Sequence, residues 1–505
     1  MATTTLLAPK TTHRQKWKAA ALAFACLCFC SGKVQFCAGE KNVVATTTNP
    51  IPPTREERFP SVATRVKLYM SNWYTPPCEG DGDARVRYAF RDPGSKNKNQ
   101  STWPTLEVEG FRGHPVVNQT TRIMENVRSI IEPDTLFFMD EGTILNCGNF
   151  SYDEEWGKQT MDPYRERIRF RHNMRMYCED IEKLLLPAWY HLRMPDQSRK
   201  PDDAKTNDRS EPPPTLIQFG DNKQSHVFKD VNVPHIKKFR SAALEPRDLE
   251  DVTSEECYSS KGAANGSGGN TIRKALASAH GDHRFQPIVW KLATDRHYKK
   301  LNDVYRYDTQ WSHKKDMAIF RGQLTGSRDG YDKRKTDDEN CHNMKRCRLV
   351  YNHANSTLIH ARLTSTRERL PDVLNGVELL AGKVKIDTLL QYKGIIMIEG
   401  NDVASGLKWA LLSQSIVLMP VPKHTSWCME ELLEPWVHYV PLDENATDVE
   451  EKMEWVVGHE AEARKISERA TLWMEDMVFH PDAAEDDRLI QEEILRRYER
   501  HFAKA

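Results

Sequence analysis

Residues 392–420 read YKGIIMIEGNDVASGLKWALLSQSIVLMP, and their hydrophobic pattern is the clearest indication of the fold class. Its residues 394–398 form a continuous apolar run, the pattern of a strand that is buried on both faces. A helical spacing follows over 404–412, and a second apolar run over 416–419 ends at Pro420. Because a strand, a helix and a strand at this spacing form a βαβ unit, the stretch predicts a parallel sheet and an α/β fold.

The same periodicities predict further elements on either side of this unit. The predicted strands are 135–139, 215–219, 317–320, 349–351 and 437–440. The predicted helices are 164–186, 388–392, 448–457, 460–477 and 486–502. Two polar segments, 195–214 and 259–270, interrupt the first half of the chain and predict surface loops.

Length and charge limit the class of protein. The chain has 505 residues, which suits two or three domains. Lys plus Arg and Asp plus Glu both number 72, so no global basic field would hold nucleic acid. Any anion that the protein binds therefore needs a local site.

The N-terminus has the pattern of a targeting segment. Basic residues precede an apolar run of 12 residues, AAALAFACLCFC, at 19–30. A spanning helix needs about 20 apolar residues and a signal h-region about 7–15, so the length suits a signal peptide within residues 1–40. An uncleaved type II membrane anchor stays open, because short spans suit thin early-secretory membranes. A Thr- and Pro-rich stem is expected over 41–68.

Two further counts fit the secretory-pathway lumen, in the endoplasmic reticulum or the Golgi. Six N-x-S/T sequons occur, at Asn99, Asn118, Asn149, Asn265, Asn355 and Asn445. Beyond the leader there are seven cysteines, at Cys78, Cys147, Cys178, Cys257, Cys341, Cys347 and Cys428. An oxidising compartment would pair some of them. Cys341 and Cys347 are close enough for a local loop, but the sequence leaves the pairing open.

The segment between the two strands of the βαβ unit is the first candidate ligand site. Ligands of parallel sheets bind beyond the carboxyl ends of the strands, which is where residues 399–405 are placed. The helix N-terminus there offers free N–H groups, Ser405 adds a hydroxyl, and Lys408 lies one turn in. With Asp402, this group suits a diphosphate. The alternative is an Asp or Ser helix cap followed by a solvated lysine.

A second candidate follows the predicted strand 317–320. Residues 321–327 read RGQLTGS, so Arg321 enters a turn that contains Thr325 and Ser327. Arginine binds phosphate bidentately, and glycine lets the backbone approach a ligand closely. The alternative is a strand-end arginine in a surface salt bridge.

A candidate general base lies in the first half of the chain. Asp221 follows the predicted strand 215–219, and an unperturbed aspartate, with a pKa of about 4, is ionised in the lumen. Asp140 and Glu141 follow the strand 135–139 in the same way. The alternative for each of them is a turn residue.

Taken together, these residues resemble glycosyltransferase family 90. That family includes protein O-glucosyltransferases, fungal capsule-associated xylosyltransferases and bacterial lipopolysaccharide-modifying transferases. Residues 392–420 are similar to the family's donor-site segment, and SWCMEELLEPWVHYVPL at 426–442 is similar to the block that follows it. FRGQLTG at 320–326 is similar to the family's FRG-S/T turn, and fainter similarity extends the resemblance to about 215–475. Lys408 departs from the animal branch, which has an arginine nearby.

The resemblance implies a GT-B-like fold, with two Rossmann-like domains facing a cleft and a C-terminal helix that crosses back. The implied parts are an acceptor-side domain at 69–305, a donor domain at 306–475 and a terminal helix at 476–505. The implied reaction is an inverting, metal-independent transfer from a UDP-sugar, with glucose or xylose as the sugar. The acceptor would be a hydroxyl of a protein or a glycan, and no cofactor is expected.

The resemblance also implies roles for the candidate residues. Arg321 and Lys408 would neutralise the leaving diphosphate, a cationic arrangement that stabilises developing charge. Glu430 would hold the ribose, and Asp221 would deprotonate the acceptor hydroxyl. The other donor-binding residues would be Thr325, Ser327, Asp402 and Ser405. A catalytically inactive GT-B module that binds a glycan or a nucleotide is the alternative from another class.

Overall fold

The computed structural model describes residues 59–79, 85–91, 105–109, 136–139, 180–193, 215–218, 234–242, 286–326 and 331–504. The chain divides into two units, Met1–Pro52 and Pro53–Ala505, and every described residue belongs to the second. The predicted leader, most of the stem and both polar loops therefore lie outside the described residues. In the described part, no helix combines the length and the apolar character that a membrane span requires.

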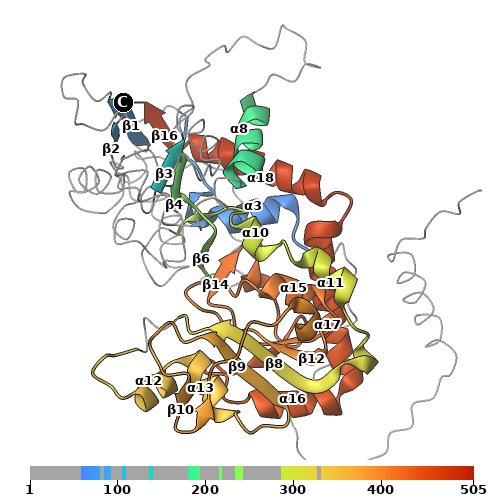
Figure 1. Cartoon of the computed structure of the whole chain (residues 1–505). Coiled ribbons are helices and arrows are strands. Elements are labelled where there is room, and N and C mark those ends of the chain that lie inside the picture. Colours follow the sequence, from blue (N-terminus) through green and yellow to red (C-terminus); the bar gives the residue numbers. More distant parts are fainter. Residues whose placement is uncertain are drawn as a thin grey trace, which may run out of the picture. The chain divides into compact units, whose positions relative to one another are not determined.

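The second half of the chain is built on a five-stranded sheet in which all neighbouring strands are parallel (Figure 1). The strands, in sheet order, are β15 (Val440–Leu442), β13 (Ile416–Pro420), β12 (Tyr392–Ile396), β8 (Lys315–Gln323) and β9 (Ile359–Ser365). Helix α15 (Leu407–Leu412) connects β12 to β13, so the predicted βαβ unit is confirmed. The helix begins later than predicted, because Leu407 N–H bonds the Ala404 carbonyl and 404–406 form a turn.

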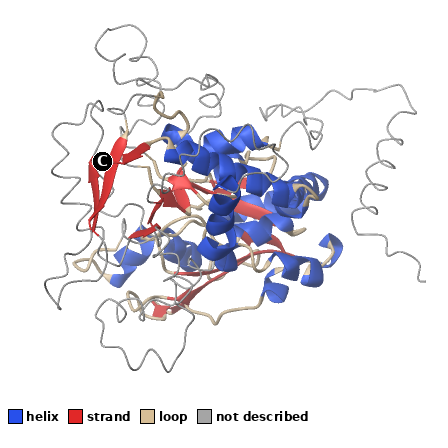
Figure 2. Ribbon diagram, turned by 90° about the horizontal axis from the view of Figure 1, so that it is seen from above, coloured by secondary structure: helices blue, strands red, loops and turns tan. Residues whose placement is uncertain are grey.

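Alternate residues of these strands enter two separate cores, as the two-residue period of a strand requires. Ala318 and Phe320 pack with α13 (Lys345–Asn352) and α16 (Val449–Gly458). Ile319 packs on the opposite face with α15 and α17 (Glu460–Met474). Figure 2 shows the strands with helices gathered around them. Burial on both faces explains why 394–398 is apolar without alternation.

The other elements complete the described part of the chain. The remaining α-helices are α3 (Val62–Met70), α8 (Leu186–Arg193), α10 (Thr294–His297), α11 (Leu301–Tyr307), α12 (Asp337–Asn343), α14 (Ile386–Leu389) and α18 (Ala483–Glu499). The remaining strands are β1 (Val86–Arg91), β2 (Thr105–Glu109), β3 (Leu136–Met139), β4 (Thr215–Gln218), β5 (Ile236–Lys237), β6 (Phe239–Ser241), β7 (Ile288–Val289), β10 (Val373–Leu374), β11 (Val377–Glu378), β14 (His424–Ser426) and β16 (Phe502–Lys504). Short 3₁₀ segments cover Ser71–Trp73, Trp311–His313 and Glu430–Leu432, and π-helical turns cover Ile181–Leu185 and Glu475–Phe479. The first half contributes a four-stranded sheet in the order β3-β4-β5-β7, which confirms the predicted strands at 135–139 and 215–219.

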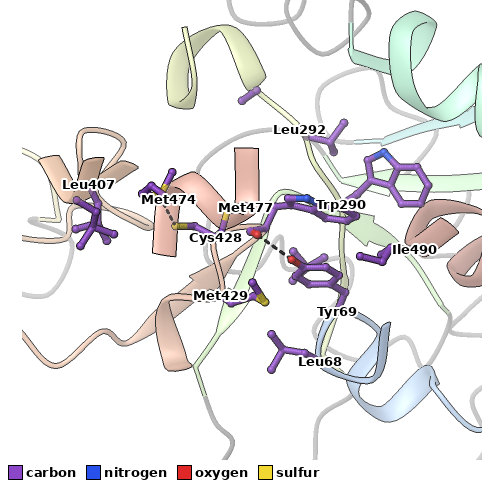
Figure 3. Close-up of a cluster of buried hydrophobic side chains, with 14 of the residues drawn as sticks. Leu68, Tyr69, Trp290, Leu292, Leu407, Cys428, Met429, Met474, Met477 and Ile490 are labelled. Carbon is purple, nitrogen blue, oxygen red and sulfur yellow. Dashed lines mark hydrogen bonds between the residues drawn. The ribbon is translucent and has the colours of Figure 1, made fainter. Parts of the chain in front are cut away.

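One hydrophobic cluster joins the first half of the chain to the second. Figure 3 shows Leu68 and Tyr69 of α3 among residues that lie far along the chain, including Cys428 and Met429. Tyr69 Oη donates to the Trp427 carbonyl at 2.8 Å, and the two rings stack with centroids 4.2 Å apart. Strand β6 also pairs with β14, so the two halves share backbone hydrogen bonds.

The C-terminal helix α18 packs against α3 and α8, which come from the first half of the chain. Its Asp487 accepts hydrogen bonds from Arg65, Lys291 and Trp427. The mixed α/β architecture with a parallel sheet is compatible with a Rossmann-like glycosyltransferase fold. The division at 305/306 into acceptor and donor domains stays a prediction.

Three sequence predictions need correction. The helix predicted at 388–392 is α14, which covers Ile386–Leu389, and Tyr392 already opens strand β12. The strand predicted at 349–351 is wrong, because these residues belong to helix α13. Three adjacent apolar residues fit either a strand or a helix, and here Cys347 and Val350 bury one helical face. The strand predicted at 437–440 begins only at Val440.

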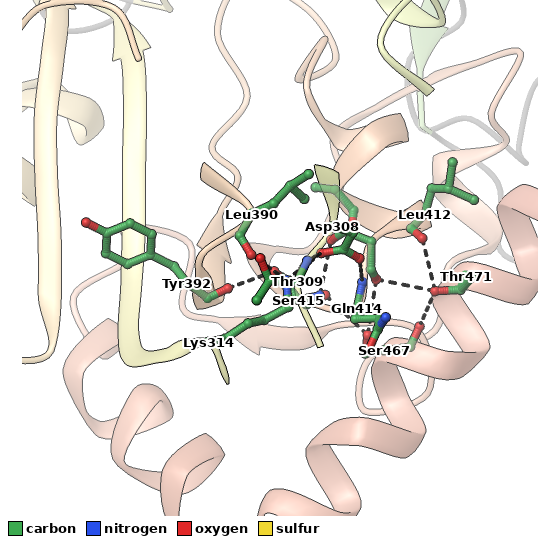
Figure 4. A network of polar contacts seen from close by, with 12 residues as sticks. Asp308, Thr309, Lys314, Leu390, Tyr392, Leu412, Gln414, Ser415, Ser467 and Thr471 are labelled. Atoms are coloured by element: carbon green, nitrogen blue, oxygen red, sulfur yellow. Dashed lines mark hydrogen bonds and ion pairs between the residues drawn. The ribbon is translucent and has the colours of Figure 1, made fainter. Parts of the chain in front are cut away.

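A polar network around Asp308 fixes the amino ends of the parallel strands (Figure 4). Its carboxylate accepts from Lys314 Nζ at 2.6 Å, just before β8, and from Gln414 N at 2.7 Å, just before β13. Ser415 Oγ donates to the Tyr392 carbonyl at 2.7 Å, at the start of β12. With its amino edge fixed, the sheet presents the loops at its carboxyl edge for a binding site.

Candidate functional site

Two glycine-containing loops meet at the carboxyl edge of the parallel sheet. One follows β8 and contains Thr325 and Gly326, and the other follows β12 and contains Gly400 and Asn401. Gly326 N–H donates to Asn401 Oδ1 at 3.0 Å. Gly326 has φ +78°, and a Cβ there would lie 2.9 Å from the Gly400 carbonyl oxygen. Both the backbone angle and the close approach therefore require glycine at 326.

Arg346, which the sequence analysis did not single out, bridges these loops. Its Nη1 donates to the Gln323 carbonyl at 2.8 Å and to Thr325 Oγ1 at 2.7 Å. Its Nη2 donates to the Ile398 carbonyl at 2.6 Å. Burial lowers the pKa of Arg346 to about 10, which still leaves a cation at neutral pH. The one signal for it in the sequence is its place in the short Cys341–Cys347 segment.

Two acidic residues tie the loop after β12 to its surroundings. Asp402 Oδ2 lies 2.5 Å from Lys238 Nζ, and both side chains are buried. Glu399 accepts from the backbone N–H of Lys423 at 3.1 Å and of His424 at 3.0 Å, and its second oxygen lies 2.8 Å from His424 Nδ1. Asp402 therefore connects this loop to β5 and β6, and Glu399 connects it to β14.

Lys408 and Glu430 form a buried ion pair. Their Nζ and Oε1 atoms are 2.5 Å apart, and their side chains are 0% and 1% exposed. Glu430 also accepts from Ser426 N–H at 2.7 Å and from Ser426 Oγ at 2.8 Å. The two charges offset each other, so a diphosphate contacts Lys408 only if this pair opens.

Arg321 belongs to β8, and its side chain contacts the neighbouring strand β9. Its Nη1 donates to the His360 carbonyl at 2.9 Å, and its Nη2 is 2.9 Å from His360 Nε2. Arginine can only donate, so Nε2 accepts and Nδ1–H donates to Tyr392 Oη at 2.8 Å. These contacts belong to a different group from those of Arg346.

Several cations surround the two loops. Burial lowers the pKa of His297 well below its ordinary value, and the charges of Lys408, Lys238 and Arg296 lower it further. His297 Nδ1 is buried and has no hydrogen-bond partner among the described residues. After burial, the charges that act on the pKa of Arg346 are Asp402 and Glu399, which raise it, and Arg296 and Arg367, which lower it. The carboxyl edge therefore carries both cations and carboxylates, and Lys238 and Lys408 are each paired with a carboxylate.

Comparison with known proteins places this edge inside a family match. The sequence model of the family described as "Glycosyl transferase family 90" matches residues 294–481. This part of the chain is therefore similar to glycosyltransferase family 90. The matched residues contain β8, β12, both loops and Arg346, whereas Asp221 and Lys238 precede them.

Individual relatives agree with this match. The chain is similar to the O-glucosyltransferase LpsA of Dichelobacter nodosus, with 42% identity over 85 residues, 17% of this chain and 27% of that protein. Protein O-glucosyltransferase 2 of Danio rerio shows 34% identity over 91 residues, 17% of each chain. Uncharacterized protein 035R of Invertebrate iridescent virus 3 shows 29% identity over 184 residues, 34% of this chain and 16% of that protein. The chain thus spans about a quarter or less of the length of these relatives.

The structure brings some of the predicted residues together. Thr325 and Asp402 lie in the two contacting loops, and Ser405 is half-buried in the turn before α15. Asp221 and Ser327 lie outside the described residues, as do Asp140 and Glu141. In the part of the chain that the structure describes, no three His, Cys, Asp or Glu side chains are grouped to hold a metal ion.

Proposed function

We propose that this chain is an inverting, metal-independent glycosyltransferase. It would move a sugar, glucose or xylose, from a UDP-sugar to a hydroxyl of a protein or glycan acceptor. The observation that carries the proposal is the close contact of the loops after β8 and β12 at the carboxyl edge of a family 90 sheet. Such an edge is where α/β folds bind ligands.

The donor diphosphate is placed at these two loops. Thr325, Ser327 and Ser405 would donate hydroxyl hydrogen bonds, and the nearby backbone N–H groups would add others. The charge would be met by the cations around these loops, with Arg321 as a candidate, while Arg346 would act through its hydrogen bonds to the loops. Three cations, Lys408, Lys238 and Arg296, act on the nearby His297, and two of them are paired with Glu430 and Asp402 before a donor binds.

Lys408 and Glu430 enter the proposal as a pair. Lys408 reaches the diphosphate, and Glu430 the ribose, only if donor binding separates them. Their burial and short distance support a role in shaping the turn at 426–430 before the donor arrives.

The reaction is a single displacement. The acceptor oxygen attacks the anomeric carbon as the bond from that carbon to the β-phosphate oxygen breaks, and the electron pair leaves with UDP. The acceptor proton goes to a carboxylate, for which Asp221 is the candidate. One displacement inverts the anomeric configuration.

The test is transfer by the full-length chain, with the product anomer read by NMR. We expect a β-linked product from an α-linked UDP-sugar in the presence of EDTA, and none from Asp221→Asn although its donor binding is retained. A retained configuration, or a requirement for added metal, would contradict the mechanism. Donor binding without transfer to any acceptor would support the inactive binding module instead.

We also propose that the protein is in the secretory lumen, soluble or with an N-terminal membrane anchor. The Cys341–Cys347 disulfide supports an oxidising compartment. The sequon residues Asn355 and Asn445 are both exposed, as glycan acceptors must be. Loss of mass on peptide N-glycosidase treatment tests the compartment, and carbonate extraction distinguishes anchored from soluble protein. An unglycosylated, reduced protein from its native cell would contradict the proposal.

A further inference from the structure

A short disulfide loop lies directly beside the residue that bridges the two glycine loops. Cys341 and Cys347 are bonded, with their Cα atoms 5.0 Å apart, and both are fully buried. Cys341 belongs to α12 and Cys347 to α13, and the turn between these helices is at Met344. Arg346 immediately precedes Cys347, so the disulfide restrains the backbone from which its side chain extends.

Other contacts hold the same helical pair in place. Thr336 caps α12 in a capping box with Glu339, which satisfies backbone N–H groups at both residues. Asn340 is buried, donates to the Asp332 carbonyl at 3.0 Å and accepts from Asp332 N–H at 2.8 Å. The pair is therefore anchored at its start by hydrogen bonds and at its turn by the disulfide.

The three hydrogen bonds of Arg346 all go to the polypeptide that forms the two loops. One acceptor is the carbonyl of Gln323 at the end of β8, one is Thr325 Oγ1 in the loop that follows it, and one is the carbonyl of Ile398 in the segment after β12. A Cβ at Gly400 would lie 3.1 Å from Arg346 Nη2, so the guanidinium also fills the space behind that loop. An arginine fork can bridge separate acceptors in a fixed geometry, whereas a lysine ammonium cannot reproduce that planar fork.

We propose that Arg346, held by the Cys341–Cys347 disulfide, is a positioning residue that sets the distance between the two donor loops. It acts through the loops and need not touch the donor itself. The inference relies on the proposed function for the identity of the ligand. The ordering of both loops by the disulfide and Arg346 does not depend on any ligand.

The experiment compares full-length Arg346→Gln, Arg346→Lys and the double variant Cys341→Ala/Cys347→Ala with wild type. Variants are preferable to a reductant, because Cys78 is also disulfide-bonded. The matched control is Arg348→Gln, since Arg348 lies on the same helix but donates to the His342 and Asn445 carbonyls. The readouts are donor-free hydrogen exchange at 323–326 and 398–402, and the KM and kcat for the UDP-sugar.

We expect exchange in both loops to rise about tenfold or more in Arg346→Gln, the effect of losing charge-assisted hydrogen bonds. The donor KM should rise by a similar factor, with a smaller change in kcat. Arg346→Lys should give an intermediate result, and the double cysteine variant should loosen the same loops although Arg346 is present. Arg348→Gln should leave both loops as in wild type.

Unchanged hydrogen exchange in both loops of Arg346→Gln would overturn the inference. Wild-type exchange and wild-type donor KM in Arg346→Lys would also overturn it, because the positive charge alone would then explain the effect. Unchanged exchange in the folded double cysteine variant would overturn the role of the disulfide. If that variant does not fold, the arginine series still decides whether Arg346 positions the loops. Absence of any nucleotide-sugar binding by wild type would refute the proposed function but leave the exchange result valid.

Discussion

At the scale of single residues, the site depends on positions where only one side chain fits. Gly326 combines a left-handed backbone with a neighbouring carbonyl oxygen at the limit of contact. Gly376 has almost the same backbone angle, φ +80°, but no atom within 4 Å of a Cβ. The two glycines therefore separate the cost of the backbone angle from the cost of the close approach.

We predict that Gly376→Ala lowers the free energy of unfolding by about 1 kcal/mol, the cost of a left-handed alanine. Gly326→Ala should cost at least about twice as much, because its Cβ also displaces Gly400. Urea unfolding of the two variants measures the difference. Equal losses would show that the loops are not packed as closely as described.

A second residue-scale prediction concerns the pair Lys408 and Glu430. Lys408→Met should lower the free energy of unfolding by about 3–5 kcal/mol, because it leaves a buried carboxylate without its partner. The double variant Lys408→Met/Glu430→Gln should recover more than half of that loss. Additive losses in this double-mutant cycle would mean that the two residues do not act as a pair.

Sequence reasoning identified part of the site at this scale. Thr325 and Asp402 were predicted from strand-end turns, and the structure places both in the contacting loops. Arg346 was missed because its role depends on the helix pair α12 and α13, within which the sequence predicted only a strand at 349–351. The pairing of Lys408 with Glu430 depends on a contact across 22 positions of chain, which no local pattern specifies.

At the scale of elements, the buried strands were the most predictable. Runs such as 394–398 and 416–419 are apolar because helices cover both faces of the sheet, so their pattern is distinctive. Short amphipathic segments were less predictable. Residues 349–351 fit both the helical and the strand period, and their packing in the folded protein makes them helical. The pairing of β6 with β14 joins segments nearly two hundred positions apart and could not be read locally.

The prediction at this scale concerns the docking of α18. Asp487→Asn should lower the free energy of unfolding by about 3 kcal/mol, because Arg65 and Lys291 then lose a largely buried counter-charge. Asp486→Asn is the control, since Asp486 is 36% exposed and lies 3.9 Å from Arg65. Chemical denaturation of both variants measures the contrast, and similar midpoints would contradict the role given to Asp487.

At the scale of the whole molecule, buried histidines make stability depend on pH. Burial lowers the pKa of His501 to about 4, and His501 Nε2 donates to the Trp73 carbonyl at 2.8 Å. The pKa of His297 is also lowered by burial. The folded state therefore resists protonation of groups that the unfolded state protonates near pH 6.5.

The resulting stability is fully present above pH 6.5 and is lost as the pH falls toward 4. Between pH 7 and pH 5, His501 alone should account for a loss of about 2 kcal/mol. Urea unfolding at the two pH values measures it, with His501→Gln as the variant that removes this share. An identical pH dependence in His501→Gln would contradict the assignment.

We expect a nucleotide sugar to bind at the carboxyl edge of the parallel sheet. A thermal-shift panel of nucleotides and nucleotide sugars on the full-length chain, with EDTA present, tests this binding directly. UDP and at least one UDP-sugar should raise the Tm by about 2–4 °C near saturation. An unchanged Tm with every nucleotide and nucleotide sugar in the panel would contradict the claim.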